Sequence, residues 1–285
     1  MTTLVLGHLV LDEIHAWDGS VYHAAGGITF SLGAFDALAE EDDRVVPVFP
    51  FGSDATDIVD DLAMRFRHVD FSSCWQVPEG NTRVRLFHES PAQYNTQLVR
   101  SLAPVPRERY APLLAEAKLV YCNLMTGEDI LPQDAAALRG EGRLVFIDLH
   151  MIAYRVHRDG RREPAPAAQW KQWFSAGDIV QCNEREFVAL TGRSGADTAY
   201  VRELMEESGT GIFILTRGED GADIFTTTDA PRHVPAVRVP AAVDPTGCGD
   251  AFGATFARMR AGGASIDGAA AEAAARVVRR ERDAG

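Results

Sequence analysis

The chain has 285 residues, a formal net charge of −13, 46% hydrophobic and 24% charged residues, which is ordinary for a globular protein with one large core or two modest ones. The acidic balance excludes a basic nucleic-acid-binding surface, and no apolar run approaches the ~20 residues needed to span a bilayer. The opening residues MTTLVLGHLVLDE have no basic segment and meet an acid early, which makes a secretory signal unexpected and predicts a cytoplasmic protein. From the charge and the apolar runs we expect neither nucleic-acid nor membrane partners.

The pattern of apolar residues predicts strands and helices that alternate along the chain, which is typical of an α/β fold with a largely parallel sheet. Strands are expected at Thr3–Gly7, Val45–Pro50, Leu119–Asn123, Arg143–Leu149, Asp178–Cys182 and Gly211–Thr216, then an antiparallel pair at Ala222–Thr227 and His233–Val239. Helices are expected at Gly26–Glu40, Ser53–Phe66 with Ser53 as N-cap, Arg107–Ala117, Gln133–Arg139, Ala167–Ser175, Glu184–Thr191, Thr198–Ser208 and Ser265–Arg280. A surface loop is expected at His157–Pro166.

Two predicted hairpins interrupt this alternation. The first covers Glu13–Ala25, and the second joins Thr82–His88 to Tyr94–Leu102. Insertions of this kind usually cover a ligand site at the ends of the strands of a sheet. We therefore predict a single domain over the whole chain, with lid segments near 12–25 and 81–99.

Lysine and cysteine usage excludes several kinds of site. The chain has only Lys118 and Lys171, and neither follows glycine, so a Gly-Lys-Ser/Thr phosphate loop is absent. The cysteines are isolated, and no C-x-x-C exists, so neither a disulfide framework nor a zinc site is expected. Cys248 lies at the start of a predicted helix, and because a helix N-terminus lowers a thiol pKa, a redox role is left open for it.

The most informative stretch is VDPTGCGDAFG at Val243–Gly253, between an apolar, strand-like segment and a predicted helix. Gly247 and Gly249 have no Cβ, so the backbone can approach a ligand, and the first amides of the helix have no carbonyl partners. Such a turn binds anions such as phosphate. Asp250 either caps the helix or accepts the proton of a substrate hydroxyl that attacks a phosphoryl group. The glycines match a dinucleotide-binding loop only weakly, because their spacing differs from G-x-G-x-x-G.

Two earlier stretches offer groups for a polyhydroxylated ligand. Asp12 follows the first strand, where open α/β sheets bind ligands, and its carboxylate could accept two hydroxyl hydrogen bonds or could belong to a turn. Gly26 and Gly27 precede a predicted helix, as either a flexible entry turn or bare backbone against a substrate.

Two later stretches offer groups for a phosphate donor. Asn183 and Glu186 are three residues apart at the start of a helix, which fits a capping box and equally a carboxylate that holds Mg²⁺ through water. The segment Thr216–Gly221 reads as a hairpin turn. Asp148 ends a strand and is expected to face the same site, and His150 is interpreted as a structural or pocket-wall histidine.

The motif Asp-Pro-Thr-Gly-Cys-Gly-Asp resembles the C-terminal motif of the ribokinase-like (PfkB) family of carbohydrate and nucleoside kinases, whose pattern reads Asp-Thr-Thr-Gly-Ala-Gly-Asp. The resemblance implies a three-layer α/β/α sandwich with a mostly parallel central sheet and a small β lid. It also implies ATP and Mg²⁺ as cofactors, leaves a monovalent cation open, and raises the possibility of a homodimer through the lid.

The resemblance also assigns roles to individual residues. It makes Asp250 the catalytic base and gives the anion hole to Gly247, Cys248 and Gly249. It places the acceptor against Asp12, Gly26, Gly27 and Ser31, which stands where the family often has Asn. It places the nucleotide and hydrated Mg²⁺ near Asn183, Glu186, Thr216, Gly218 and Thr246.

These inferences predict an ATP-dependent phosphotransferase that phosphorylates a hydroxyl of a small sugar or polyol. A nucleoside kinase of the same family and a catalytically silent ligand-binding paralogue are the alternatives. A nicotinamide-dependent oxidoreductase is disfavoured because the chain has no N-terminal glycine-rich fingerprint.

Overall fold

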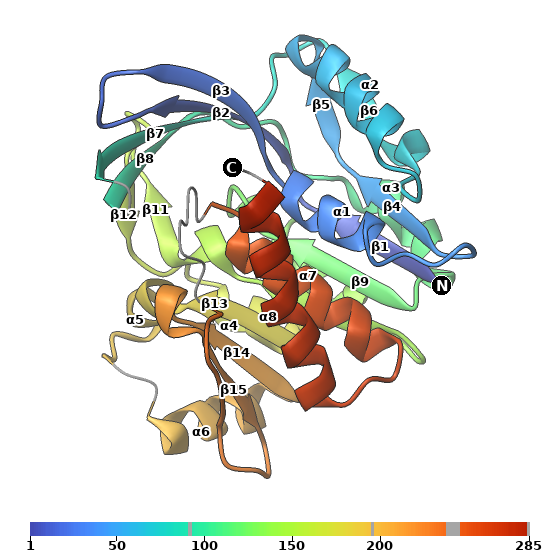
Figure 1. Ribbon diagram of the computed structural model, residues 1–285, viewed down its shortest axis with the longest axis vertical. Coiled ribbons are helices and arrows are strands. Elements are labelled where there is room, and N and C mark those ends of the chain that lie inside the picture. The colour runs from blue at the N-terminus through green and yellow to red at the C-terminus, as the bar shows by residue number, and fades with distance from the viewer. Residues whose placement is uncertain (91–92, 195–196, 238–245, 284–285) are drawn as a thin grey trace.

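The central element is an eight-stranded sheet with the strand order β16-β15-β14-β13-β10-β9-β1-β4. The computed structural model describes residues 1–90, 93–194, 197–237 and 246–283. Six strands run parallel and the last two antiparallel, as the sequence predicts (Figure 1). Their bounds are β1 Thr2–Leu6, β4 Arg44–Val48, β9 Leu119–Asn123, β10 Leu144–Asp148, β13 Ile179–Asn183, β14 Ile212–Thr216, β15 Ala222–Thr226 and β16 Arg232–Val234.

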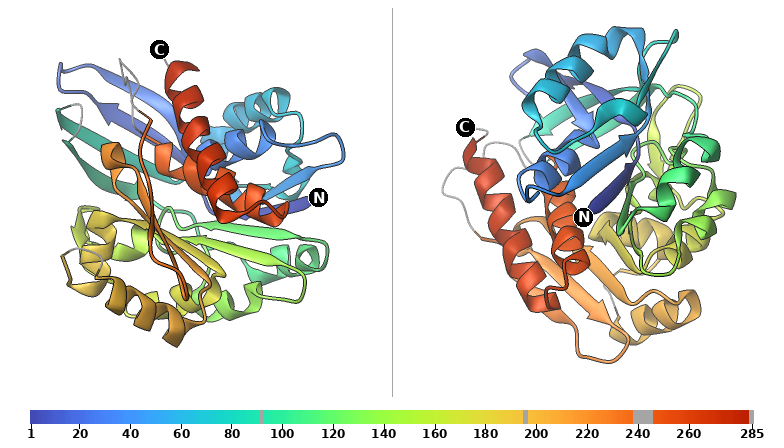
Figure 2. Two further views of the ribbon diagram at one scale, coloured as in Figure 1. Left: turned by 60° about the horizontal axis from the view of Figure 1, so that its bottom comes forward. Right: turned by 90° about the vertical axis from the view of Figure 1, so that its right-hand side faces the viewer.

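Helices cover both faces of this sheet, which gives the predicted three layers (Figure 2). Alternate side chains of each strand point to opposite faces, so Leu4 and Leu6 enter one core whereas Val5 enters the other. The first core is closed by α4 Trp170–Ala176, α5 Glu184–Thr191 and α6 Thr198–Ser208. The second is closed by α1 Thr29–Asp36, α2 Thr56–Arg65, α7 Cys248–Ala261 and α8 Ile266–Asp283.

The two predicted hairpins join into one small sheet, the lid, with the order β3-β2-β7-β8. Its strands are β2 Leu9–His15, β3 Val21–Gly27, β7 Arg83–Ser90 and β8 Gln93–Arg100. One face of the lid carries a cluster of Val10, Ile14, Val84 and Leu86, and we refer to it as the inner face. Asp12 lies on this same face because side chains alternate along a strand.

Several local expectations were wrong. Arg107–Ala117 divides into α3 Arg107–Tyr110 and a 3₁₀ helix, Ala111–Ala115, because Pro112 has no amide hydrogen to continue the α-helical ladder. Ser53 does not cap α2. It begins the 3₁₀ turn Ser53–Ala55, which precedes the helix.

Further boundaries also differ from the expectation. The helix expected at Gln133–Arg139 is a 3₁₀ helix, Pro132–Leu138, and Gly26 and Gly27 end strand β3 instead of starting α1. The strand expected at His233–Val239 ends at Val234 in β16. The strand-like segment expected before the glycine-rich turn covers residues 235–243; residues 235–237 are not in a strand, and residues 238–243 lie outside the described residues.

The segment expected to be a surface loop contains a strand. β12 Arg162–Pro164 pairs with β11 Tyr154–Val156 in an antiparallel hairpin. A second small pair is formed by β5 Pro50–Gly52 and β6 Trp75–Val77. Among the helices in the described part of the chain, none offers an apolar stretch long enough to cross a membrane.

Candidate active site

A tight glycine turn opens α7. Gly247 adopts the left-handed conformation with φ 74° and ψ 6° and is the N-cap of the helix. A Cβ built on Gly247 would lie 2.4 Å from Cγ of Phe30, so both the backbone conformation and the packing favour glycine here. The turn therefore has the geometry that the sequence predicts for it.

The backbone directly after Gly247 lies ahead of the first hydrogen bond of the helix. The first helical hydrogen bond runs from the Ala251 amide to the Gly247 carbonyl at 2.9 Å, so the amides of Cys248, Gly249 and Asp250 precede the ladder. A Cβ built on Gly249 would meet no atom of the described residues within 4 Å. This bare backbone at the positive end of a 14-residue helix is suited to a phosphoryl group.

Asp250 lies in the first turn of α7 and is partly buried. Its Oδ1 accepts a short hydrogen bond from Nδ2 of Asn123, which is fully buried at the end of β9. Asn123 therefore fixes the orientation of the carboxylate. Sequence reasoning missed Asn123, although a polar residue at the carboxyl end of a predicted strand was the signal that could have found it.

Gln181 joins the turn to the neighbouring strands. Its Nε2 donates to Oδ2 of Asp148 at 2.9 Å and to the carbonyl of Gly249 at 3.1 Å. Burial and the nearby Asp250 carboxylate hold the pKa of Asp148 well above its ordinary value. Asp148 thus faces the site as predicted, whereas Gln181 was not predicted because it stands inside an otherwise apolar strand.

Asp12 approaches the same site from the lid. Burial raises its pKa to about 7, and Asp250 contributes in the same direction while Arg162 opposes the shift. A Cβ built on Gly26 would lie 1.9 Å from Asp12 Oδ2. The bare backbone at Gly26 therefore makes room for the Asp12 carboxylate.

Two further residues expected near the acceptor are constrained by contacts within the protein. Gly27 has φ 64°, and a Cβ there would lie 2.3 Å from the carbonyl oxygen of His8. Ser31 is fully buried on α1 beside the hydroxyl of Tyr121. An acceptor could therefore reach Ser31 only after some rearrangement, and its substrate role stays a prediction.

Asn183 and Glu186 form the capping box that their spacing predicts. The Glu186 amide donates to Asn183 Oδ1 at 2.9 Å, and the Asn183 amide donates to Glu186 Oε2 at 2.8 Å. Glu186 is 2% exposed, and its Oε1 also accepts a hydrogen bond from Asn183 Nδ2 at 2.6 Å. The capping interpretation is confirmed, and both carboxylate oxygens already have protein donors.

His150 completes this end of the site. Its Nδ1 lies 3.1 Å from Glu186 Oε1, and among the described residues it is the non-glycine residue with a positive φ, 31°. Burial alone would lower its pKa, but Glu186, Asp148 and Asp250 together raise the pKa of His150 to about 9. His150 is therefore a charged partner of the carboxylates. The expected structural or pocket-wall role did not include this charge.

The segment after β14 is the predicted hairpin turn. Thr216 pairs with Asn183 on the neighbouring strand, and Gly218 begins the 3₁₀ turn Gly218–Asp220 before β15. A Cβ on Gly218 would meet no atom within 4 Å. Thr246 directly precedes the glycine turn, so the residues expected at a nucleotide lie at the ends of neighbouring elements.

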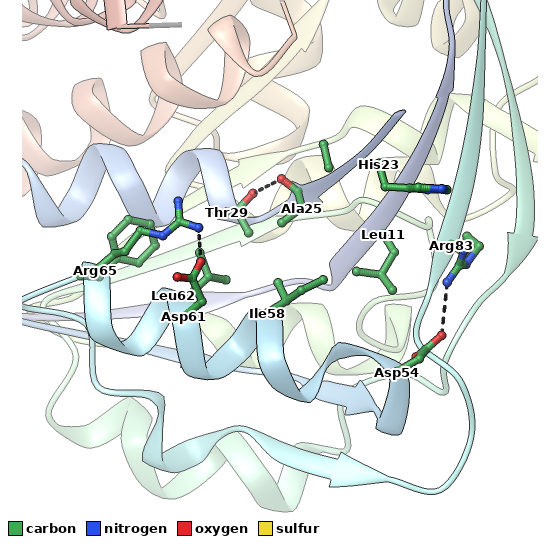
Figure 3. A pocket seen from close by; sticks show the side chains of 12 residues that line it. Leu11, His23, Ala25, Thr29, Asp54, Ile58, Asp61, Leu62, Arg65 and Arg83 are labelled. Carbon is green, nitrogen blue, oxygen red and sulfur yellow. Dashed lines mark hydrogen bonds and ion pairs between the residues drawn. The ribbon is translucent and has the colours of Figure 1, made fainter. Parts of the chain in front are cut away.

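A separate cavity of about 640 Å³ lies beside the lid, between its base and α2 (Figure 3). Leu11 and Ala25 line it, and these residues alternate with Asp12 and Gly26 along their strands. The cavity therefore faces the opposite side of the lid from Asp12. Neither Asp12 nor Asp250 lines it.

Residues 149–285 match the family model described as "pfkB family carbohydrate kinase". The chain is 32% identical over 141 residues to the bifunctional protein HldE of Alkalilimnicola ehrlichii, a match that covers 45% of this chain and only 29% of that protein. It is 25% identical over 264 residues to the cytidine kinase of Thermococcus kodakarensis, covering 89% of this chain and 86% of that protein.

Solved structures show the same fold over the whole chain. A sulfate complex of a pyrophosphate-dependent kinase in the ribokinase family superposes with a TM-score of 0.81 at 18% identity, covering 99% of this chain and 95% of that one. Arabidopsis thaliana ribokinase complexed with ribose and ATP superposes with a TM-score of 0.73 at 18% identity, covering 97% and 91%. The C-terminal part of the chain thus matches the pfkB family carbohydrate kinase model, and the whole chain has the fold of the ribokinase-family structures.

Proposed function

We propose that this protein transfers the terminal phosphoryl group of ATP to a hydroxyl group of a small sugar or polyol. One observation carries the proposal: the Asp250 carboxylate, oriented by Asn123, lies in the same helical turn as the glycine backbone of Gly247 and Gly249 at the start of α7. The proposal assigns the carboxylate as the base and the glycine backbone as the anion site, the two groups that attack of a hydroxyl on a phosphoryl group requires.

Each group in this arrangement has a separate task. Asp250 accepts the proton of the attacking hydroxyl, and the amides after Gly247 stabilise negative charge on the transferred group. Asp12 accepts hydrogen bonds from the acceptor's hydroxyls, with the backbone of Gly26 and Gly27 beside it. Thr216, Gly218 and Thr246 are proposed to lie along the donor.

Asn183 and Glu186 are proposed to hold Mg²⁺ through water and not by direct coordination. Both oxygens of Glu186 accept hydrogen bonds from Asn183, and the described residues contain no group of three or more His, Cys, Asp or Glu that could hold a metal ion directly. Mg²⁺ usually keeps several waters and takes its direct ligands from substrate phosphates. When bound, the ion would neutralise phosphate charge, with Asn183 and Glu186 holding its waters. A monovalent-cation requirement stays an untested possibility.

The first test is an acceptor panel with ATP and Mg²⁺, using sugars, inositols and nucleosides and detecting phosphorylated product by ³¹P NMR. We expect acceptor-dependent transfer to a sugar or polyol. A strong preference for nucleosides would select the alternative that the resemblance to cytidine kinase suggests. Pyrophosphate belongs in the panel as a second donor, because one fold neighbour is pyrophosphate-dependent. Thermal stabilisation by acceptors without transfer from either donor would contradict the proposal and indicate a silent paralogue.

A second test uses the titration of Asp12. Its folded pKa of about 7 means that the carboxyl is neutral below this pH and ionised above it. An ionised carboxylate accepts hydroxyl hydrogen bonds more strongly, so acceptor affinity without donor should increase between about pH 6 and pH 8. Isothermal titration calorimetry measures this change. Asp12→Asn should bind more weakly and show a flat profile; a wild-type profile that is equally flat would contradict this role.

A homodimer through the lid stays a proposal. The outer part of the lid exposes the apolar side chains of Trp17, Val21 and Phe87, which a second copy could cover. Sedimentation analysis of the wild type and of Phe87→Ser tests it, with a dimer expected for the wild type and a monomer for the variant. A wild type that sediments as a monomer would contradict it.

A further inference from the structure

The hairpin β11–β12 is joined to the lid by its turn. The Leu98 amide donates to the Gly160 carbonyl at 2.8 Å, and Gln97 Nε2 donates to the Asp159 carbonyl at 2.6 Å. Gly160 has φ 81°, and a Cβ there would lie 2.0 Å from the Leu98 carbonyl oxygen. The turn is therefore fitted closely to the backbone of β8, and the hairpin extends the lid (Figure 1).

This contact places Arg162 over the inner face of the lid. Arg162 Nη1 donates to Thr96 Oγ1 at 3.4 Å, and Nη2 lies 3.5 Å from the Met125 carbonyl oxygen. Thr96 pairs across the sheet with Leu86, which belongs to the apolar cluster of the inner face. Since Asp12 is on this same face, one surface carries both a guanidinium and a carboxylate.

We propose that Arg162 binds the acceptor together with Asp12 and determines which acceptors are used; this inference rests on the proposed kinase function. A carboxylate only accepts hydrogen bonds, whereas a guanidinium only donates them. Two adjacent hydroxyls satisfy both, because one gives its hydrogen to Asp12 and the oxygen of the other accepts from Arg162.

The charges around the pair favour an uncharged acceptor. Gln181 Nε2 donates both to Asp148 and to the carbonyl of Gly249 next to Asp250, and Asp250 interacts electrostatically with Asp12 and with Asp148. A phosphate already present on the acceptor would add a negative charge, besides that of the donor, close to these carboxylates. The acceptor class is therefore an uncharged polyol with adjacent hydroxyls, such as a free sugar, an inositol or the ribose of a nucleoside.

The test compares Arg162→Gln and Arg162→Lys with the neighbouring Arg161→Gln. Arg161 is a matched control because its side chain is 66% exposed and forms an ion pair with the exposed Asp159 at 3.9 Å. The probes are D-ribose, myo-inositol and cytidine as uncharged diols and ribose 5-phosphate as the charged counterpart. Acceptor KM, donor KM, kcat and Tm are measured for each variant.

We expect Arg162→Gln to raise the KM of the preferred acceptor roughly 10- to 100-fold, because a hydrogen bond from a charged donor is lost. The acceptor KM of Arg162→Lys should lie between those of the wild type and of Arg162→Gln, because lysine keeps the charge but lacks the planar guanidinium group. Donor KM and Tm should stay within about twofold and a few degrees of the wild type in all variants. Ribose 5-phosphate should bind more weakly than ribose to the wild type.

An unchanged acceptor KM in Arg162→Gln would overturn the inference. A joint change of acceptor KM, donor KM and Tm would also overturn it, because Arg162 would then only brace the hairpin. If the wild type transfers no phosphoryl group, the proposed function fails first, and calorimetric binding of the same uncharged probes to wild type and Arg162→Gln still decides the role of Arg162. A wild type that binds none of these diols would overturn both.

Discussion

Asp250→Asn is expected to lower kcat roughly 10²- to 10⁴-fold, the usual contribution of a positioned general base. The amide has nearly the same shape as the carboxylate, and its oxygen can still accept the hydrogen bond from Asn123. It cannot accept the proton of the attacking hydroxyl. Acceptor affinity should therefore change little while turnover falls, and steady-state kinetics with calorimetric binding separates the two quantities.

Asp267→Asn is the matched control for this variant. Asp267 also stands in the first turn of a helix, α8, but its side chain is 78% exposed and pairs with Arg232 at the surface. Because exposed ion pairs contribute little, this variant should retain wild-type kcat and KM. If the kcat of Asp250→Asn is comparable to that of Asp267→Asn, Asp250 is not the base.

Gly249→Ala is expected to abolish most of the activity without loss of stability. Gly249 is the second residue of α7, so the preference of helix interiors for alanine over glycine, about 0.5–1 kcal/mol, is an upper bound here, and its Cβ would meet no atom of the described residues within 4 Å. The added methyl group would stand beside the amides that are proposed to hold the phosphoryl group. Thermal unfolding should show an equal or higher Tm, and kcat should fall by at least an order of magnitude.

Gly247→Ala separates the effects of fold and of catalysis at the same turn. Its left-handed conformation costs about 1–2 kcal/mol for a non-glycine residue, and the Phe30 ring must also move. This variant should lose stability as well as activity. Wild-type kcat in Gly249→Ala would show that the phosphoryl group does not lie against this backbone, whatever the stability of Gly247→Ala.

The glycine turn of α7 was predictable because its signal is local. Gly247 needs a left-handed φ, the apolar residues of α7 recur at helical spacing, and Asp250 follows at a fixed position. The same is true of the capping box between Asn183 and Glu186, whose atoms are only three residues apart. Backbone geometry and short-range hydrogen bonding thus determined these features before any long-range contact.

The partners of these groups could not be predicted, because they come from distant segments. Asn123 reaches Asp250 across 127 residues of sequence, and Gln181 reaches the Gly249 carbonyl across 68. A polar residue within a buried strand gives no sign of the atom it will meet. The order of strands in the sheet decides that contact.

The contacts of Arg162 could not be predicted either, because the sequence predicted a loop where the structure has a hairpin. Its polar, glycine- and proline-containing surroundings predict a loop, yet the hairpin docks on β8 through Gly160 and carries Arg162 to the inner face of the lid. The sequence by itself determined the glycine-rich motif, the alternation of strands and helices and the glycine turn of α7, because those depend on neighbours along the chain. Only the tertiary structure decided which charges surround Asp12, because packing between separate sheets brings those charges together.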